Sequence, residues 1–593
     1  MVYARYSAAT RKFFALAFGL WVLAVFAALS SGTLRAEEAT QIDDTETHLR
    51  TLLETYIDDK KYEFYESGID VHYEGEILIE SFDGYFSVTL PYVTMEMQNG
   101  TKLDVGQIAL NIAPFGTDSG QWKMTFALPT PIGFTPYNID KDDAATKINL
   151  TIGGQRSSGV WNEALNYFSK LDANFHGLRL NSIDDSFSLS IPSSRIVYDL
   201  ESDTSGKWSG PVYFNISDIH YKPDADAPEK DLTIGAFDLN LEMFQYDPAA
   251  TPAYQQELMA LLNIAEAPGV LKPNFAKFYE AFVAMIGNGF TSEYQLSDAQ
   301  IGQTDLFETL TALRLDNLHF GFDLTGFLED KVSLGIRVGF DGLMPTPPLS
   351  ISPAQAPKNM NIDLVLENIP VREIMQTAFD HFAAETHDAE YDESDIRETA
   401  DISEDAKAAA FEMLQSIPDI LRRSATTLNV NNNYVGNDFY TLELSGALMT
   451  APDQSLLPVT GAMNGKIFGL DALLEQVTIE MQAAMAEQSE KVSNLQALAM
   501  SLTLLRGFAK TETDETGEIL HTFSFDIGTE GQLTVNGNDL SALLALLNLA
   551  QPVAASGSSG GAITQGTPAA PNTKSAPVPD VKIESDRETG VTE

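Results

Sequence analysis

Two glycine–serine motifs have the residue types and spacing of a hydrolase site. Gly557–Gly561 (GSSGG) matches the G-x-S-x-G pattern of a nucleophile elbow. An elbow needs a strand before it and a helix after it, whereas this stretch lies in a Pro/Gly/Ser-rich tail, which favours coincidence. Gly116–Gly120 (GTDSG) is similar to a serine-protease loop, but a hairpin turn between Ile112 and Trp122 explains it more simply. Neither motif assigns a catalytic residue.

A second candidate is a metal site formed by His381, Glu385, His387 and Asp388, since imidazole and carboxylate groups are zinc ligands. The two histidines are six positions apart, which places them on different faces of a helix. A structural zinc site is therefore not favoured over weak, adventitious binding.

Two acidic clusters are candidate calcium-binding loops. Counted from Asp388, an EF-hand would need Gly at the sixth position and Glu at the twelfth, and the sequence has Glu393 and Thr399 there. Residues 138–143 (NIDKDD) fail the same test. A looser calcium contact through Asp388, Glu390, Asp392, Glu393 and Asp395 stays open, but no metal ligand and no cofactor-binding residue is assigned.

His319 is the remaining candidate, and its neighbours decide its orientation. It stands between Leu318 and Phe320, so an alternating strand would place it on the polar face. The chain has no P-loop and no GxGxxG motif. It also has no Cys, which excludes thiolate catalysis, zinc ribbons and Fe–S ligation.

The net charge of the chain argues against two classes of binding partner. The 593 residues include 36 Lys and Arg against 84 Asp and Glu, a net charge of −48. This balance opposes nucleic-acid binding and electrostatic docking on anionic lipid. Hydrophobic residues make up 44%, enough for most of the chain to bury a core.

Residues 1–36 have the layout of a secretory signal. Four basic residues and no acidic one accompany an uncharged run over residues 13–29, and Ala36 precedes Glu37. We expect export to the periplasm, with cleavage before Glu37 as the preferred outcome. Because 17 apolar residues are the lower limit for a bilayer span, an uncleaved inner-membrane anchor is the alternative. Removal of 1–36 would leave a net charge of −52.

Most of the remaining chain alternates apolar and polar residues, which predicts antiparallel strands that are wet on one face. The clearest examples span 122–128, 187–191, 237–243, 318–324, 332–340, 362–366, 440–444 and 523–527. Helical spacing predicts helices at 45–57, 158–171, 370–383 and 404–423, a helical hairpin over 252–287, and one or two long helices over 471–509.

These elements suggest a division of the chain. Residues 37–250 form a β-rich region with short helices, 251–290 the helical hairpin, 291–370 a second β-rich region, and 371–550 a helix/strand region with an acidic loop at 380–405. Residues 551–593 are expected to be disordered. Two pairs of similar stretches suggest repeats: 421–425 with 505–509, and 105–112 with 234–241.

The order of elements resembles the YdgA-like family of bacterial envelope proteins. The likeness rests on the helix after the signal, on the hairpin at 252–287, and on the ending. In that ending a long helix precedes strand 523–527, the stretch 531–537 (GQLTVNG) and a final helix from Asp539. The resemblance implies an envelope location and a β-rich, elongated build. It supplies no catalytic residues.

The sequence thus predicts an α+β protein with long antiparallel sheet covered on one face by amphipathic helices, elongated and repeat-built. The expected function is a non-enzymatic structural or interaction role in the envelope, with an envelope protein as partner. The alternatives are an amphiphile- or lipid-binding periplasmic module and a hydrolase with a dispersed site. No nucleic-acid partner is expected. Contact with the membrane is expected only through residues 13–29, and only if the signal is not cleaved.

Overall fold

A computed structural model describes residues 45–540 of the chain, with several gaps. The gaps fall at 67, 99, 117–119, 137–146, 164, 166, 183–186, 224–230, 263–273, 303–312, 346–355, 389–415, 452–458, 487–491, 514–516 and 518. The predicted signal at 1–36 and the predicted tail at 551–593 lie outside the described residues. Within the described ranges, no helix has the length and apolar character needed to span a membrane.

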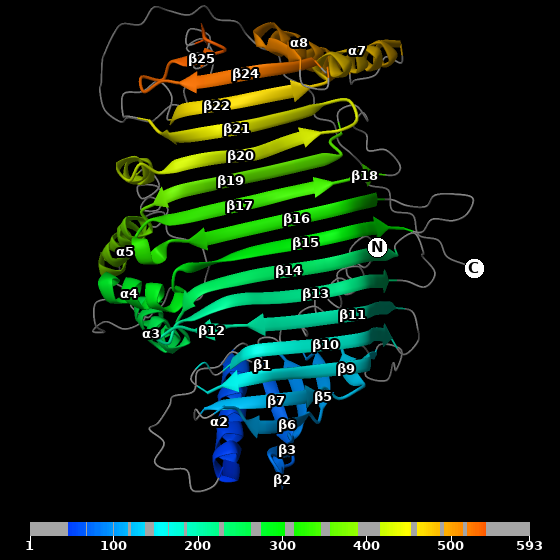
Figure 1. Cartoon of the computed structure of the whole chain (residues 1–593), viewed down its shortest axis with the longest axis vertical. Coiled ribbons are helices and arrows are strands. Elements are labelled where there is room, and N and C mark those ends of the chain that lie inside the picture. Colours follow the sequence, from blue (N-terminus) through cyan, green and yellow to red (C-terminus); the bar gives the residue numbers. More distant parts are fainter. Residues whose placement is uncertain are drawn as a thin grey trace, which may run out of the picture. The chain divides into compact units, whose positions relative to one another are not determined.

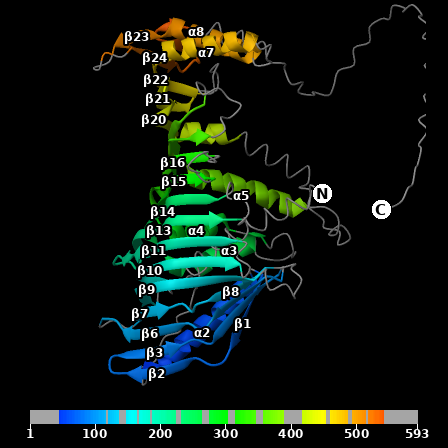
Figure 2. The ribbon, with the colours of Figure 1, turned by 90° about the vertical axis from the view of Figure 1, so that its right-hand side faces the viewer.

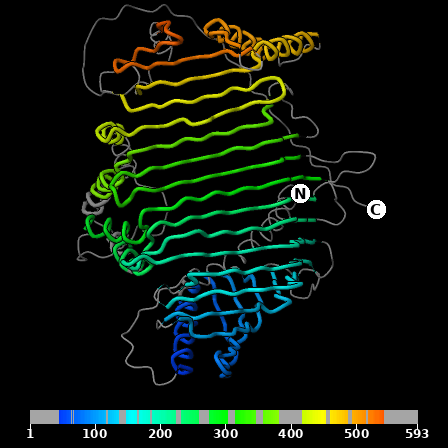
Figure 3. Tube along the Cα trace, viewed as in Figure 1, coloured from blue at the N-terminus to red at the C-terminus, as the bar shows by residue number. Residues whose placement is uncertain are grey.

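The described strands form one antiparallel sheet, in which most neighbours follow each other in chain order (Figures 1 and 3). Its long strands are β9 (Ile148–Asn162), β10 (Tyr167–Ser182), β11 (Ser188–Asp199), β13 (Trp208–Lys222), β14 (Leu232–Tyr246), β15 (Gly289–Ile301), β16 (Leu313–Thr325), β17 (Val332–Asp341), β19 (Asn359–Ile369), β20 (Thr427–Gly436), β21 (Thr441–Thr450), β22 (Val459–Phe468) and β24 (Ile519–Ile527). All eight alternating stretches predicted from the sequence lie largely within these strands or in β7.

Shorter strands complete the sheet at both ends. The N-terminal ones are β1 (Ile69–Glu74), β2 (Leu78–Phe82), β3 (Tyr85–Thr89), β4 (Tyr92–Met97), β5 (Lys102–Gly106), β6 (Ala109–Pro114), β7 (Gln121–Ala127) and β8 (Ile132–Thr135). The others are β12 (Glu201–Ser202), β18 (Met344–Pro345), β23 (Lys510–Thr513), β25 (Leu533–Val535) and β26 (Asn538–Asp539). Both β7 and β8 pair with β9, which joins the N-terminal strands to the long sheet.

The helices border the sheet, which Figure 2 shows from another side. They are α2 (Thr45–Glu66), α3 (Thr251–Leu262), α4 (Phe275–Ile286), α5 (Val371–Asp388), α7 (Leu470–Ala486) and α8 (Val492–Phe508), with short 3-10 turns η3 (Pro248–Ala250) and η5 (Phe327–Glu329). Residues 416–423 are also helical. These positions confirm the predicted helices at 45–57, 252–287, 370–383 and 471–509, the last as two helices. The predicted acidic loop at 380–405 begins later than expected, because α5 runs through Asp388.

Helix α4 shows how the sequence sets an element boundary. The Asn274 side chain accepts hydrogen bonds from the backbone N–H groups of Ala276 and Lys277, and so caps the first turn. Gly287 ends the helix with a φ of 64°, a conformation that glycine adopts at little cost. The chain can then turn directly into β15.

The helix predicted at 158–171 is wrong. Residues 148–162 and 167–182 form the neighbouring strands β9 and β10, and Trp161 lies directly opposite Phe168. Their rings meet edge to face with centroids 5.3 Å apart. Residues seven positions apart share one face of a helix, but they also meet across a short hairpin. The apolar spacing therefore fits both a helix and a hairpin. The packing of Trp161 against Phe168 across the two strands favours the hairpin.

The C-terminal stretch 531–537 ends in a turn. Asn536 and Gly537 have φ angles of 50° and 81° and reverse the chain between β25 and β26, as their tolerance of positive φ predicts. Asp539 lies in β26 opposite Thr534. The final helix predicted beyond it falls outside the described residues.

The two suggested repeats have different outcomes. The stretches 421–425 and 505–509 each end a helix that leads into a β-hairpin, β20–β21 and β23–β24 respectively. The second pair does not match: residues 105–112 span the end of β5 and the start of β6, whereas 234–241 lie inside β14. The shared alternation of amphipathic strands produced that similarity.

Candidate functional site

One face of the long sheet carries rows of side chains that are apolar except for Ser292, and we call it the apolar face. In each row the residues lie directly opposite one another on successive strands. The first row consists of Phe237, Leu296, Leu318, Phe340, Met360, Val435, Leu442 and Ile467. The second consists of Leu239, Tyr294, Phe320, Val338 and Ile362. The third consists of Leu241, Ser292, Phe322, Ile336, Leu364 and Val430.

The middle of this face is open to solvent. Five of its side chains, on four adjacent strands, are between 37 and 40% exposed: Tyr294, Leu318, Phe320, Ile336 and Ile362. Aromatic and branched aliphatic side chains at this exposure leave an apolar patch in contact with water. A contiguous apolar patch on a protein surface is a candidate binding site.

Packed elements border the open patch. Next to the third row, one buried cluster consists of Phe327, Val332 and Ile369. Leu324, Leu334 and Leu366 of the sheet pack against it, as do Phe282, Val283 and Ile286 of α4. At the C-terminal flank, α7 and α8 join a core cluster with Leu442, Ile467 and Phe523. At the N-terminal flank, Ile216 is fully buried in the largest described core cluster, with Phe237 packed against it. The exposed patch therefore lies between three buried regions.

The opposite face of the same strands is polar and internally paired. Asp238 accepts hydrogen bonds from the Tyr213 hydroxyl at 2.9 Å and from the Asn215 amide at 2.8 Å. Arg337 forms an ion pair with Asp323 at 3.1 Å. Burial, followed by the hydrogen bond to Asp238, raises the pKa of Tyr213 above its ordinary value. Since one face is paired and hydrated and the other is apolar, the strands have a strong sidedness.

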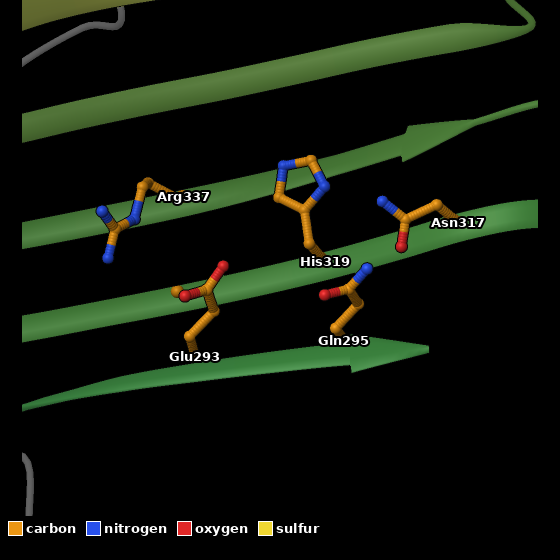
Figure 4. A pocket seen from close by; sticks show the side chains of 6 residues that line it. Glu293, Gln295, Asn317, His319 and Arg337 are labelled. Carbon is orange, nitrogen blue, oxygen red and sulfur yellow. The ribbon is translucent and has the colours of Figure 1, made fainter. Parts of the chain in front are cut away.

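A shallow hollow of about 260 Å³ interrupts this polar face (Figure 4). We call it the polar hollow, and six residues line it: Glu293, Gln295, Asn317, His319, Gly321 and Arg337. Its floor is at Gly321, which lies directly between Glu293 of β15 and Arg337 of β17. A Cβ atom on Gly321 would come within 2.7 Å of the Arg337 Nε atom. The missing side chain therefore creates the hollow.

The electrostatics of the hollow are dominated by acids. The pKa of Asp323 is raised above its ordinary value, first by partial burial and then by the nearby Asp363 and Glu293, while Arg337 acts in the opposite direction. The lining itself holds one carboxylate, Glu293, and one guanidinium group, Arg337. Asp323 and Asp363 add two carboxyl groups to the same part of the sheet.

The residues that the sequence singled out are not brought together by the fold. His319 lies on the polar face, as the alternation predicts. Residues 116–120 connect β6 with β7, which pair antiparallel, so the hairpin interpretation of that motif is confirmed for the described strands. Backbone positions place His381, Glu385, His387 and Asp388 on α5. Residues 138–143, 390–395 and 557–561 lie outside the described residues.

No group of three or more His, Asp or Glu residues in the described ranges is arranged to hold a metal ion. The polar hollow itself was missed by the sequence reasoning. Its residues come from three strands, and only the register between those strands brings them together. The available signal was the polar half of each alternating strand, in particular the glycine among the polar positions of β16.

No family model, curated protein or solved structure matches this chain.

Proposed function

We propose that this protein is an exported, non-enzymatic module that binds the hydrocarbon part of an amphiphile on the apolar face. The observation that supports this most directly is the exposure of Tyr294, Leu318, Phe320, Ile336 and Ile362 in adjoining rows. Covering such a patch removes apolar surface from water, which is the main driving force for binding an alkyl chain.

The size of the patch favours a small amphiphile over a protein. Strands are about 4.8 Å apart and residues along a strand rise about 3.4 Å. The open part covers four strands and three rows, so it measures roughly 14 Å by 14 Å, or about 200 Å². A stable protein partner usually covers about 800 Å² on each side. An alkyl chain can be held by the smaller area.

The chemistry of the rows also favours hydrocarbon. The three rows contain no charged side chain, and the buried Ser292 hydroxyl donates to the Phe322 carbonyl oxygen at 3.2 Å. A peptide would bring a series of backbone N–H and C=O groups that need partners, whereas among the exposed side chains of this patch only the Tyr294 hydroxyl can form a hydrogen bond. The clusters that contain residues of α4, α7 and α8 would form part of the rim of the site.

Export and the envelope location remain part of the proposal. They rest on the basic, apolar and small-residue order of residues 1–36 and on the resemblance to the YdgA-like family. The structural or interaction role expected first from the sequence is the competing function. It would fit better if the face were filled by a partner protein.

A binding titration tests the proposal. The full chain without residues 1–36 is titrated with a fluorescent fatty acid, together with Phe320→Asp and a matched control, Met449→Asp. Met449 is 44% exposed and alternates with Leu448, so it lies on the opposite face. We expect Phe320→Asp to abolish most binding, because a charge would enter the second row, and Met449→Asp to bind like the wild type.

Two outcomes would contradict the proposal. Equal binding by wild type and Phe320→Asp would remove the apolar face as the site. A wild-type dimer that Phe320→Asp converts to a monomer, without fatty-acid binding by either, would assign the face to a second copy of the chain.

The hydrolase alternative gains no support from the polar hollow. His319 and Glu293 line it, but none of the six lining residues is a Ser, Thr or Cys that could act as a nucleophile.

A further inference from the structure

We propose that the polar hollow binds a small organic cation through a primary ammonium group. The site lies on the opposite sheet face from the proposed amphiphile site and does not depend on it. The argument combines the shape of the hollow, its surplus of hydrogen-bond acceptors and its net charge.

The orientation of His319 follows from a chain of hydrogen bonds. The Asn361 Nδ2 atom donates to the Asn432 carbonyl oxygen at 2.9 Å, which fixes the orientation of that amide. The Asn361 Oδ1 atom lies 3.0 Å from His319 Nε2 and can only accept. His319 therefore carries a proton on Nε2, and in that tautomer Nδ1 can accept a hydrogen bond.

The other lining groups add acceptors. The Glu293 carboxylate is exposed and forms no ion pair with a described residue. The Asn317 Oδ1 atom is buried without a hydrogen-bond partner, and Gln295 supplies an amide oxygen. In Figure 4 these side chains stand around one space, with His319 between Arg337 and Asn317. A primary ammonium group has three donors and no acceptor, so it complements this set.

Charge selects a cation over a neutral donor. Glu293, Asp323 and Asp363 influence one another on this face, and Arg337 is their one basic neighbour. Arg337 is already paired with Asp323 at 3.1 Å and also lies directly opposite Asp363, so one guanidinium group faces three carboxylates on this face. The small volume of about 260 Å³ limits the ligand to a compact amine or the amine end of a longer molecule.

Calorimetric titration with putrescine tests this inference, with 1,4-butanediol as the neutral isostere. The variant is Glu293→Gln. The matched control is Glu367→Gln, an exposed acid on the same face of β19, four residues from Asp363. We expect saturable putrescine binding at physiological salt, no binding of the diol, and a loss of about tenfold or more in Glu293→Gln, as for a charge-assisted hydrogen bond. Glu367→Gln should bind like the wild type.

An equal loss in both variants would overturn the inference, because it would show general attraction of a polyamine to a chain with a net charge of −48. Absence of putrescine binding by the wild type, or equal binding of the diol, would overturn it as well. Displacement of putrescine by Mg²⁺ at equal concentration would reassign the hollow to inorganic cations.

Discussion

Tyr294 and Phe320 lie directly opposite each other on β15 and β16, with ring centroids 5.9 Å apart and both rings open to solvent. Aromatic pairs of this kind usually stabilise a sheet from within a core. Here the pair is at the centre of the open apolar patch, between core clusters that include residues of α4, α7 and α8. This relationship is the basis for the amphiphile-binding proposal.

Helices α7 and α8 each carry an apolar residue whose substitution tests whether it belongs to the hydrophobic core. Leu470 is fully buried, whereas Leu504 on α8 is among the most exposed apolar residues. We expect Leu470→Ala to lower the free energy of unfolding by about 2–5 kcal/mol, as for large-to-small changes in a core. Leu504→Ala should change it by less than about 0.5 kcal/mol. Urea denaturation measures both, and equal effects would show that the helices do not pack on the sheet in this way.

The Asn536–Gly537 turn gives a second stability prediction. The Asn536 amide donates to the carbonyl oxygens of Phe508 and Thr522 and accepts from the Ser524 N–H group, at 2.8 to 3.0 Å. Asn536→Ala removes all three bonds and places Ala at a positive φ, so we expect a loss of about 2–4 kcal/mol. Gly537→Ala meets no atom within 4 Å and should lose only about 1 kcal/mol from its positive φ. The reverse order of denaturant midpoints would contradict this role for Asn536.

Asp323 predicts a pH dependence. Because its folded pKa is raised above its unfolded value, the folded state retains the proton more strongly. Its contribution to stability is therefore present below the unfolded pKa and is lost as the pH rises through the folded pKa. Asp323→Asn removes the titrating carboxyl group and, with it, this pH-dependent contribution to stability. The unfolding midpoint of the variant relative to wild type should thus improve as the pH rises from about 4, the ordinary value for an aspartate, through the folded pKa. A constant or falling difference would show that the Arg337 ion pair outweighs the burial of Asp323.

If the protein is exported and its signal is cleaved, the mature chain begins at Glu37. Mass spectrometry of the protein isolated from its native cells should find Glu37 as the first residue, in a periplasmic fraction. An intact N-terminus in the membrane fraction would favour the anchor, and a cytosolic pool would contradict export.

The sequence predicted the sidedness of the sheet well, because period-two alternation is a local property. The residues Leu318 to Leu324 and Val332 to Phe340 form the strands expected of them. It failed at Trp161 and Phe168, where a spacing of seven fits a helix and a hairpin equally. It also could not find the polar hollow or the open patch. His319 and its partner Asn361 are 42 positions apart, and only the strand register brings such residues together.

Photo-crosslinking maps the proposed site most directly. The chain without residues 1–36 is incubated with a fatty acid that carries a diazirine in its alkyl chain, illuminated, digested and analysed by mass spectrometry. The account predicts labels concentrated on the strands of the open patch, at or beside Tyr294, Leu318, Phe320, Ile336 and Ile362, which an excess of unmodified fatty acid suppresses. Labels that are scattered over both faces, or that concentrate elsewhere and compete in the same way, would contradict it.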